Sequence, residues 1–139
     1  MEGNAESLPF PDESFDAVVN VEASHSYPHF DRFLPEMVRV LRPGGHFLYA
    51  DFRGYLEYDD WDAALAAIPM QMASKRDIST EVLRGMDRNS EVFLDLNSRH
   101  IPKVLQSFGK LFSGAPGTLA YRQLQSGKAS YRMYHFIKD

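Results

Sequence analysis

Cysteine is absent from the 139-residue chain. Disulfide bonds, thiolate metal sites and cysteine nucleophiles are therefore excluded, which is compatible with a reducing compartment. No stretch approaches the roughly 20 apolar residues of a membrane span. The start of the chain is too acidic and too often interrupted by polar residues for a signal peptide. We therefore expect a cytoplasmic protein with no stable membrane insertion.

The composition is typical of one globular domain, because 44% of the residues are apolar and 24% are charged. The charge is distributed unevenly. Residues 1–62 carry 13 acids and 4 bases, a balance of −9, whereas residues 63–139 carry 6 acids and 11 bases, a balance of +5. The basic residues are scattered and are not interleaved with stacking aromatics, so nucleic acid is not an expected partner.

The first half of the chain contains a strand, helix, strand pattern. The β-branched run at residues 15–21 predicts a strand buried on both faces. Apolar residues at helical spacing in residues 30–41 predict an amphipathic helix, with Asp31 as its N-cap and the Pro-Gly-Gly at residues 43–45 as its stop. Residues 46–52 then predict a second buried strand. This βαβ unit implies parallel pairing with a right-handed crossover and an α/β fold.

The second half has a less regular pattern. Residues 54–113 favour helices, one of which begins near Ser79. Near the end of the chain, residues 118–124 and 129–138 flank a glycine-containing turn at residues 125–128. This arrangement is typical of a β-hairpin, which we expect to close the edge of the sheet.

Three motifs carry a resemblance to a known family. Residues 3–10, 14–18 and 38–45 occur in the order and at the spacing of the patterns G-[DN]-A-x-x-L-P-F, S-F-D-x-V and R-V-L-[RK]-P-G-G. Together they resemble the middle of a class I S-adenosylmethionine-dependent methyltransferase. The resemblance implies a Rossmann-like fold and S-adenosylmethionine as the cofactor.

Further segments, at residues 20–30, 49–53, 81–85 and 130–139, resemble a narrower group, the phthiotriolone/phenolphthiotriolone dimycocerosates methyltransferases. This resemblance runs from about residue 3 to the end of the chain. It implies O-methylation of a hydroxyl on a lipid or polyketide-type acceptor. Aromatic and methionine side chains within residues 61–112 either line the lipid pocket or, as is more common for such a stripe, form core.

The family places a glycine-rich cofactor loop and a ribose-binding acid before the first of these motifs, and this chain contains no G-x-G pattern. The resemblance therefore implies a domain truncated at its N-terminus. In it, residues 1–53 form the second half of the cofactor site, residues 54–113 a helical substrate cover and residues 114–139 the terminal hairpin. The alternative is a non-catalytic half-domain that binds lipid, or that pairs with a second copy or a complementing chain through an exposed sheet edge.

Candidate cofactor-binding residues lie in the loop before the first strand and at its carboxyl end. Asn4 and Ala5 match the family's adenine-binding position, although Asn4 has the alternative role of forming an Asx-turn. Asn20, Val21 and Glu22 follow at the carboxyl end of the strand, where ligands of open α/β sheets bind. We expect Asn20 and Val21 to contact the cofactor. Glu22 either faces the sulfonium and accepts a proton, or is a solvated turn carboxylate.

His25 is the candidate general base, because a neutral imidazole can accept the proton that a hydroxyl loses as it attacks a methyl carbon. A milder alternative is that His25 only orients the acceptor. Tyr27 and His29 are lesser candidates, and either can instead cap the following helix. His25 and His29 have no evident third ligand, so no metal site is expected. Asp51 and Arg53, at the end of the second strand, either shape the site or form an ion pair.

Overall fold

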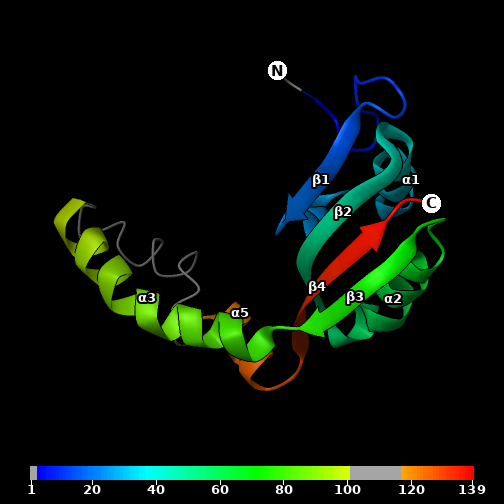
Figure 1. The fold of residues 1–139 in the computed structure, drawn as a ribbon. Coiled ribbons are helices and arrows are strands. Elements are labelled where there is room, and N and C mark those ends of the chain that lie inside the picture. Colours follow the sequence, from blue (N-terminus) through cyan, green and yellow to red (C-terminus); the bar gives the residue numbers. More distant parts are fainter. Residues whose placement is uncertain (1–2, 101–116) are drawn as a thin grey trace. The chain divides into compact units, whose positions relative to one another are not determined.

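The computed structural model describes residues 3–100 and 117–139, without the side chains of residues 91–100. Contacts divide the chain into two units, one of residues 1–77 with 132–139 and one of residues 78–131. The elements, drawn in Figure 1, are β1 (Phe15–Val21), η1 (Ser24–Ser26), α1 (Phe30–Val40), β2 (Leu41–Gly54), η2 (Tyr55–Glu57), α2 (Tyr58–Ala66), β3 (Gln71–Asp77), α3 (Ser79–His100), α5 (Leu119–Gln125) and β4 (Ala129–Ile137).

The four strands form one sheet in the order β1-β2-β4-β3. β1 and β2 are parallel, with Val18 opposite Phe47, so the predicted βαβ unit and the α/β class are confirmed. β3 and β4 are antiparallel. The backbone of Lys138, just after β4, exchanges hydrogen bonds with Gly44 and Gly45 near the start of β2. The end of one strand therefore pairs with the beginning of the other, and β4 runs opposite to β2.

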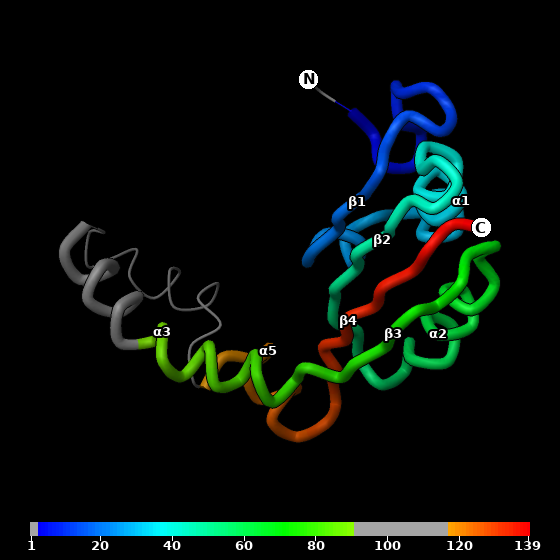
Figure 2. Tube along the Cα trace, viewed as in Figure 1, coloured from blue at the N-terminus to red at the C-terminus, as the bar shows by residue number. Residues whose placement is uncertain are grey.

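One face of the sheet is covered by α1 and α2, which lie on the same side of it (Figure 2). On α1, the buried Phe33 and Met37 recur at the four-residue spacing that places side chains on one helix face. They pack on a layer of buried aromatic rings from β2 and β4 that includes Phe47 and Tyr134. The positions of the core residues thus follow from the helical and strand periods of the sequence.

Two details of the first half differ from expectation. β1 is not buried on both faces, because the side chains of Val19 and Val21 are 64% and 56% exposed. β1 is the last strand of the sheet, and no described element covers this face. Asp31 is not the N-cap of α1. The helix begins at Phe30, two residues earlier than an Asp31 cap implies, and His29 takes the cap position without a side-chain cap bond. The predicted glycine stop at 43–45 lies inside β2.

The predicted terminal hairpin is wrong in its first strand, because residues 119–125 form helix α5. Thr118 caps this helix, with its hydroxyl oxygen accepting a hydrogen bond from the Tyr121 backbone N–H at 3.4 Å. The antiparallel partner of β4 is β3, which lies within the stretch expected to be helical. All seven residues of β3 are exposed and they lack apolar alternation, so pairing with β4 fixes the strand conformation.

In the unit of residues 78–131, α3 begins at Ser79, as expected, and runs to His100. The Ser79 hydroxyl oxygen accepts a hydrogen bond from the Tyr131 backbone N–H at 2.9 Å. Tyr121 on α5 donates to Asp87 on α3 at 2.8 Å. The expected helical residues 101–112 lie outside the described residues. Among the described helices, none combines the length and the apolar character that a bilayer crossing requires.

Candidate active site at the carboxyl ends of β1 and β2

The segment after β1 turns sharply back over the sheet. Glu22 adopts a left-handed backbone conformation with φ of 50°, and its N–H donates to the Ala50 carbonyl at 2.9 Å. The short helix η1 follows, with Ser24 buried and His25 partly exposed. Because β1 and β2 are parallel neighbours, this turn lies beside the residues that follow Ala50. Glu22 itself is exposed.

His25 and Asp51 form the central pair of the site. The His25 Nδ1 lies 2.8 Å from Asp51 Oδ1, and the His25 backbone N–H donates to Asp51 Oδ2 at 3.0 Å. The His25 side chain is 31% exposed, whereas that of Asp51 is fully buried. An ionised carboxylate can only accept hydrogen bonds, so Nδ1 carries the proton and Nε2 keeps its lone pair. The Nε2 lone pair of this tautomer can accept a proton.

Asp51 remains ionised despite its burial. Burial alone raises the pKa of this carboxyl. Hydrogen bonds from Ser24, His25 and the Phe52 backbone N–H, together with the nearby Arg53 charge, lower it by more than burial raises it. The net pKa therefore lies below its ordinary value. The Ser24 hydroxyl donates to Asp51 Oδ2 at 2.5 Å, and Arg53 Nη1 lies 3.3 Å from the same oxygen. The carboxylate is therefore a permanent acceptor for the His25 ring.

A directional chain of hydrogen bonds runs from α2 to this carboxylate. Trp61 Nε1 donates to the Tyr49 hydroxyl at 3.0 Å, and the Tyr49 hydroxyl lies 2.7 Å from Ser24 Oγ. Ser24 uses its only proton on Asp51, so Tyr49 must donate to Ser24. Burial raises the pKa of Tyr49 to about 12, which keeps that phenol protonated. Trp61 is thus a buried core residue whose hydrogen bond to Tyr49 fixes the far end of this chain.

Arg53 is committed to the same network. Its Nη2 donates to Ser24 Oγ at 3.0 Å, and its guanidinium lies 5.3 Å from the Phe30 ring centroid and 5.2 Å from that of Trp61. The ion pair with Asp51 that sequence offered as one explanation is present. Arg53 also shapes the site, because its position fixes Ser24 and therefore Asp51.

Sequence reasoning did not join His25 to Asp51, although it named both. The βαβ pattern predicted that the two strand ends meet, which brings the two loops to the same edge of the sheet. The register, with Val21 beside Ala50, comes from the structure and makes the residues that follow neighbours. Ser24 and Tyr49 were not predicted at all, because a buried serine and a buried tyrosine in a strand give no distinct sequence pattern.

A cavity of about 350 Å³ opens beside His25. Its walls combine aromatic and small side chains with three carboxylates, and it is lined by Ser24, His25, Tyr27, Phe30, Asp31, Arg53, Glu57, Asp60, Trp61 and Ala64. A hydroxyl group bound in this cavity would lie near the His25 imidazole. The cavity is therefore the candidate binding site of a methyl acceptor.

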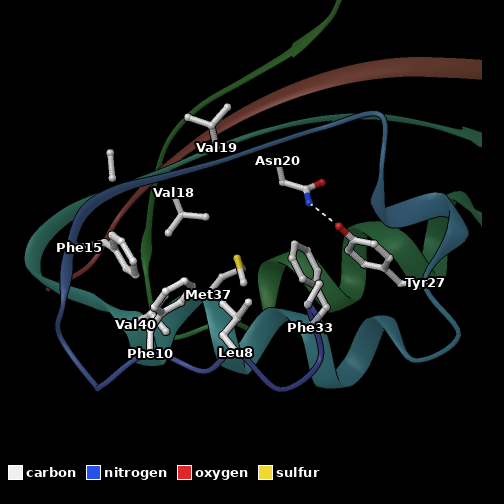
Figure 3. Close-up of a pocket in the computed structure, with 12 residues that line it drawn as sticks. Leu8, Phe10, Phe15, Val18, Val19, Asn20, Tyr27, Phe33, Met37 and Val40 are labelled. Atoms are coloured by element: carbon white, nitrogen blue, oxygen red, sulfur yellow. Dashed lines mark hydrogen bonds between the residues drawn. The ribbon is translucent and has the colours of Figure 1, made fainter. Parts of the chain in front are cut away.

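A second cavity of about 400 Å³ lies beside β1 and is largely apolar (Figure 3). Asn20 and Tyr27 both line it, and Asn20 Nδ2 donates to the Tyr27 hydroxyl at 3.0 Å. Asn20 Oδ1 is buried and has no hydrogen-bond partner among the residues that the structure describes. A buried acceptor of this kind costs free energy unless a donor reaches it. The cavity therefore fits a ligand that has an apolar body and a hydrogen-bond donor.

The structure separates the predicted cofactor residues into two sets. Ala5 and Asn20 line the same cavity, whereas Val21 lies on the opposite, exposed face of β1. Asn4 forms the Asx-turn that was its alternative explanation, since its Oδ1 accepts from the Glu6 backbone N–H at 2.9 Å. His29 stands at the start of α1, where its backbone N–H donates to Glu6 at 3.0 Å.

Comparisons with known proteins identify methyltransferases that are similar to this chain. The family described as "Methyltransferase domain" matches residues 1–49. The phthiotriol/phenolphthiotriol dimycocerosates methyltransferase of Mycobacterium tuberculosis is 57% identical over 99% of this chain and 51% of its own length. The fatty-acid O-methyltransferase of Mycolicibacterium smegmatis is 46% identical over 99% of this chain and 50% of its own length. The chain thus spans about half the length of these curated relatives.

Among solved structures, the fold is similar to that of the O-methyltransferase from a trans-AT PKS multienzyme of Brevibacillus brevis, which holds S-adenosyl-L-homocysteine. The TM-score is 0.68 at 18% identity, over 97% of this chain and 47% of that one. At this identity the similarity supports the fold alone. The match covers the sheet and helices described above and leaves half of the larger structure without a counterpart.

Proposed function

We propose that the chain belongs to the class I S-adenosylmethionine-dependent methyltransferase family and that it carries the acid–base and acceptor side of a site for O-methylation. The acceptor is a hydroxyl on a lipid or polyketide-type molecule. The observation that supports this proposal most is the buried Asp51 beneath the partly exposed His25, at the strand ends where ligands of α/β sheets bind. Assignment of the whole reaction rests on the relatives, whose length is about twice that of this chain.

His25 acts as the general base in this proposal. S-adenosylmethionine, when bound, supplies an electrophilic methyl carbon attached to a positively charged sulfur. His25 Nε2 would accept the proton that the acceptor hydroxyl loses when its oxygen receives the methyl group. Asp51 stabilises the resulting imidazolium through Nδ1–H. Glu22, which is exposed on the same turn, is the second candidate catalytic residue, and its proposed role is to face the sulfonium.

Ala5 and Asn20 are the residues proposed to hold the cofactor, because both line the apolar cavity beside β1. The unpartnered Asn20 Oδ1 is available to accept a hydrogen bond from it. Asn4 would contribute through its amide nitrogen, since its carbonyl oxygen is already used in the turn. Val21 is less suited to this role, because it projects from the other face of β1.

The site favours a neutral hydroxyl over a carboxylate as acceptor. Asp31, Glu57 and Asp60 border the cavity beside His25 and repel an anion. Arg53, the nearest cation, is held by Asp51 and Ser24. This preference agrees with the acceptor named for the Mycobacterium tuberculosis relative and differs from the one named for the fatty-acid O-methyltransferase of Mycolicibacterium smegmatis.

A second candidate function is a non-catalytic half-domain that pairs with another polypeptide or a second copy. It is favoured by the exposure of Val19, Val21 and Leu48, at 64%, 56% and 41%, on the uncovered face of β1 and β2. Contiguous exposed apolar side chains of this kind mark interaction surfaces. Sedimentation of the purified chain separates the alternatives: a Val19→Asp variant that loses self-association supports pairing between copies.

The methylation proposal is tested by joining this chain to the half of the Mycobacterium tuberculosis relative that lies outside the match, and by measuring methyl transfer to a lipid alcohol. We expect His25→Gln to lower kcat by about 10²- to 10⁴-fold without weakening cofactor binding, because only the proton acceptor is lost. His46→Gln is the matched control, since His46 pairs with His135 away from the site. Unchanged turnover in His25→Gln would remove His25 from the mechanism.

A further inference from the structure

A third cavity, of about 430 Å³, lies between α1 and the end of α2. Its walls are almost entirely apolar: Leu34, Pro35 and Val38 line it from α1, and Ala64, Ala67 and Ile68 line it from α2 and the residues that follow. From Asp31 to Val38 it follows α1 for about two turns, or roughly 10 Å. Nothing in the proposed chemistry uses this groove.

The groove adjoins the candidate acceptor cavity. Asp31 and Ala64 line both, so the polar cavity beside His25 and the apolar groove between the helices are neighbours. From the first to the second, the lining changes from carboxylates and the imidazole to mostly aliphatic side chains. A molecule with a small polar end and a hydrocarbon tail matches that change.

The charged side chains that line the two cavities set the orientation of such a molecule. Arg39 borders the groove, but its guanidinium donates to Glu36, Asp12 and the carbonyls of Phe10 and Leu8. Among the described residues that line the groove, no cation is therefore free to bind an anionic head group. Most of the described polar partners for the polar end of a ligand line the cavity beside His25, and Asp31 borders both cavities.

We infer that the groove between α1 and α2 binds the hydrocarbon chain of the acceptor while its hydroxyl lies beside His25. The inference rests on the proposed function and adds to it the path of the chain and the residues that select for its length. Apolar contact without a directional partner implies that affinity grows with chain length. A fatty acid of equal length binds less well, because its carboxylate meets Asp31, Glu57 and Asp60.

The test uses this chain as it is and does not depend on methyl transfer. Binding of 1-hexanol, 1-octanol, 1-decanol and decanoate is followed by NMR of the methyl groups of Leu34, Val38 and Ala64. We expect these signals to shift, the affinity to rise about two- to fourfold for each added methylene, and decanoate to bind at least fivefold more weakly than 1-decanol. Affinity that does not depend on chain length would overturn the inference.

Two neighbouring alanines provide a matched pair of variants. Ala67 lines the groove and Ala66 does not, and both are exposed at the carboxyl end of α2. Aspartate at either position has the same unfavourable relation to the helix dipole. We expect Ala67→Asp to weaken 1-decanol binding at least tenfold and Ala66→Asp to change it less than twofold. Equal effects of the two variants would contradict the assignment.

The outcome is separable from that of the proposed function. If His25→Gln loses methyl transfer but alcohol affinity does not depend on chain length, His25 remains the proposed base. The binding of the hydrocarbon chain in the groove is then refuted. Methyl signals of the groove that shift with protein concentration, and not with alcohol, would identify a surface between copies of the chain and overturn the inference.

Discussion

The two faces of the sheet, within the unit of residues 1–77 and 132–139, differ in what they display. One face carries an aromatic core under α1 and α2, and the hydrogen-bond chain from Trp61 to His25 lies on the same side. The other exposes Val19, Val21 and Leu48. Adjacent residues of one strand therefore serve different purposes, since the pleat sends alternate side chains to opposite faces. The candidate chemistry belongs to the covered side, and the exposed side is suited to a partner.

The largest expected effect comes from removing the charge beneath His25. In the completed domain, we expect Asp51→Asn to lower the methylation rate by about 10³- to 10⁴-fold, because the imidazolium loses its counter-ion and the ring loses its fixed tautomer. Steady-state kinetics measures this. Asp59→Asn, an exposed carboxylate on α2 outside the acceptor cavity, is the control. A rate close to that of the parent in Asp51→Asn would show that His25 needs no partner.

The contrast between faces predicts unequal costs for neighbouring truncations in β2. Phe47 is fully buried and Leu48 is 41% exposed. We expect Phe47→Ala to lower the free energy of unfolding by about 3–5 kcal/mol, because a cavity replaces the ring. We expect Leu48→Ala to lower it by less than about 1 kcal/mol. Urea denaturation of both variants gives the comparison, and similar losses would contradict the described burial.

Acid should destabilise the covered side through its carboxylates. Burial raises the pKa of Asp62, but hydrogen bonds and charges from Lys75, Tyr134 and Arg132 lower it by more. The net pKa of Asp62 is therefore below its ordinary value, as is that of Asp51. A lowered pKa in the folded state contributes stability that is complete above the unfolded pKa, near 4, and is lost as the pH falls through the folded pKa. Urea midpoints between pH 6 and pH 2.5 should therefore fall with pH, and less so in Asp62→Asn. An identical fall in that variant would exclude its contribution.

Much of the fold that positions the site could be predicted from sequence, because β1, α1 and β2 carry clear periodic patterns. The partner of β4 could not, since β3 is a wholly exposed strand fixed by pairing, and residues 118–124 were misread as a strand. Within the site, His25 could be predicted from its place after a strand. The hydrogen bond between His25 and Asp51 could not be predicted without the register of β1 and β2. The roles of Ser24 and Tyr49 could not be predicted without the packing of their side chains.

The central claim is that Asp51 holds the His25 ring with its Nε2 free to take a proton. A long-range ¹H–¹⁵N correlation spectrum of the histidine rings of this chain, recorded at pH 8, tests it without cofactor or acceptor. We predict that His25 is protonated at Nδ1 and unprotonated at Nε2, and that Asp51→Asn removes this preference. A His25 ring protonated at Nε2 in the unaltered chain would contradict the account, because that nitrogen then has no lone pair to offer an acceptor hydroxyl.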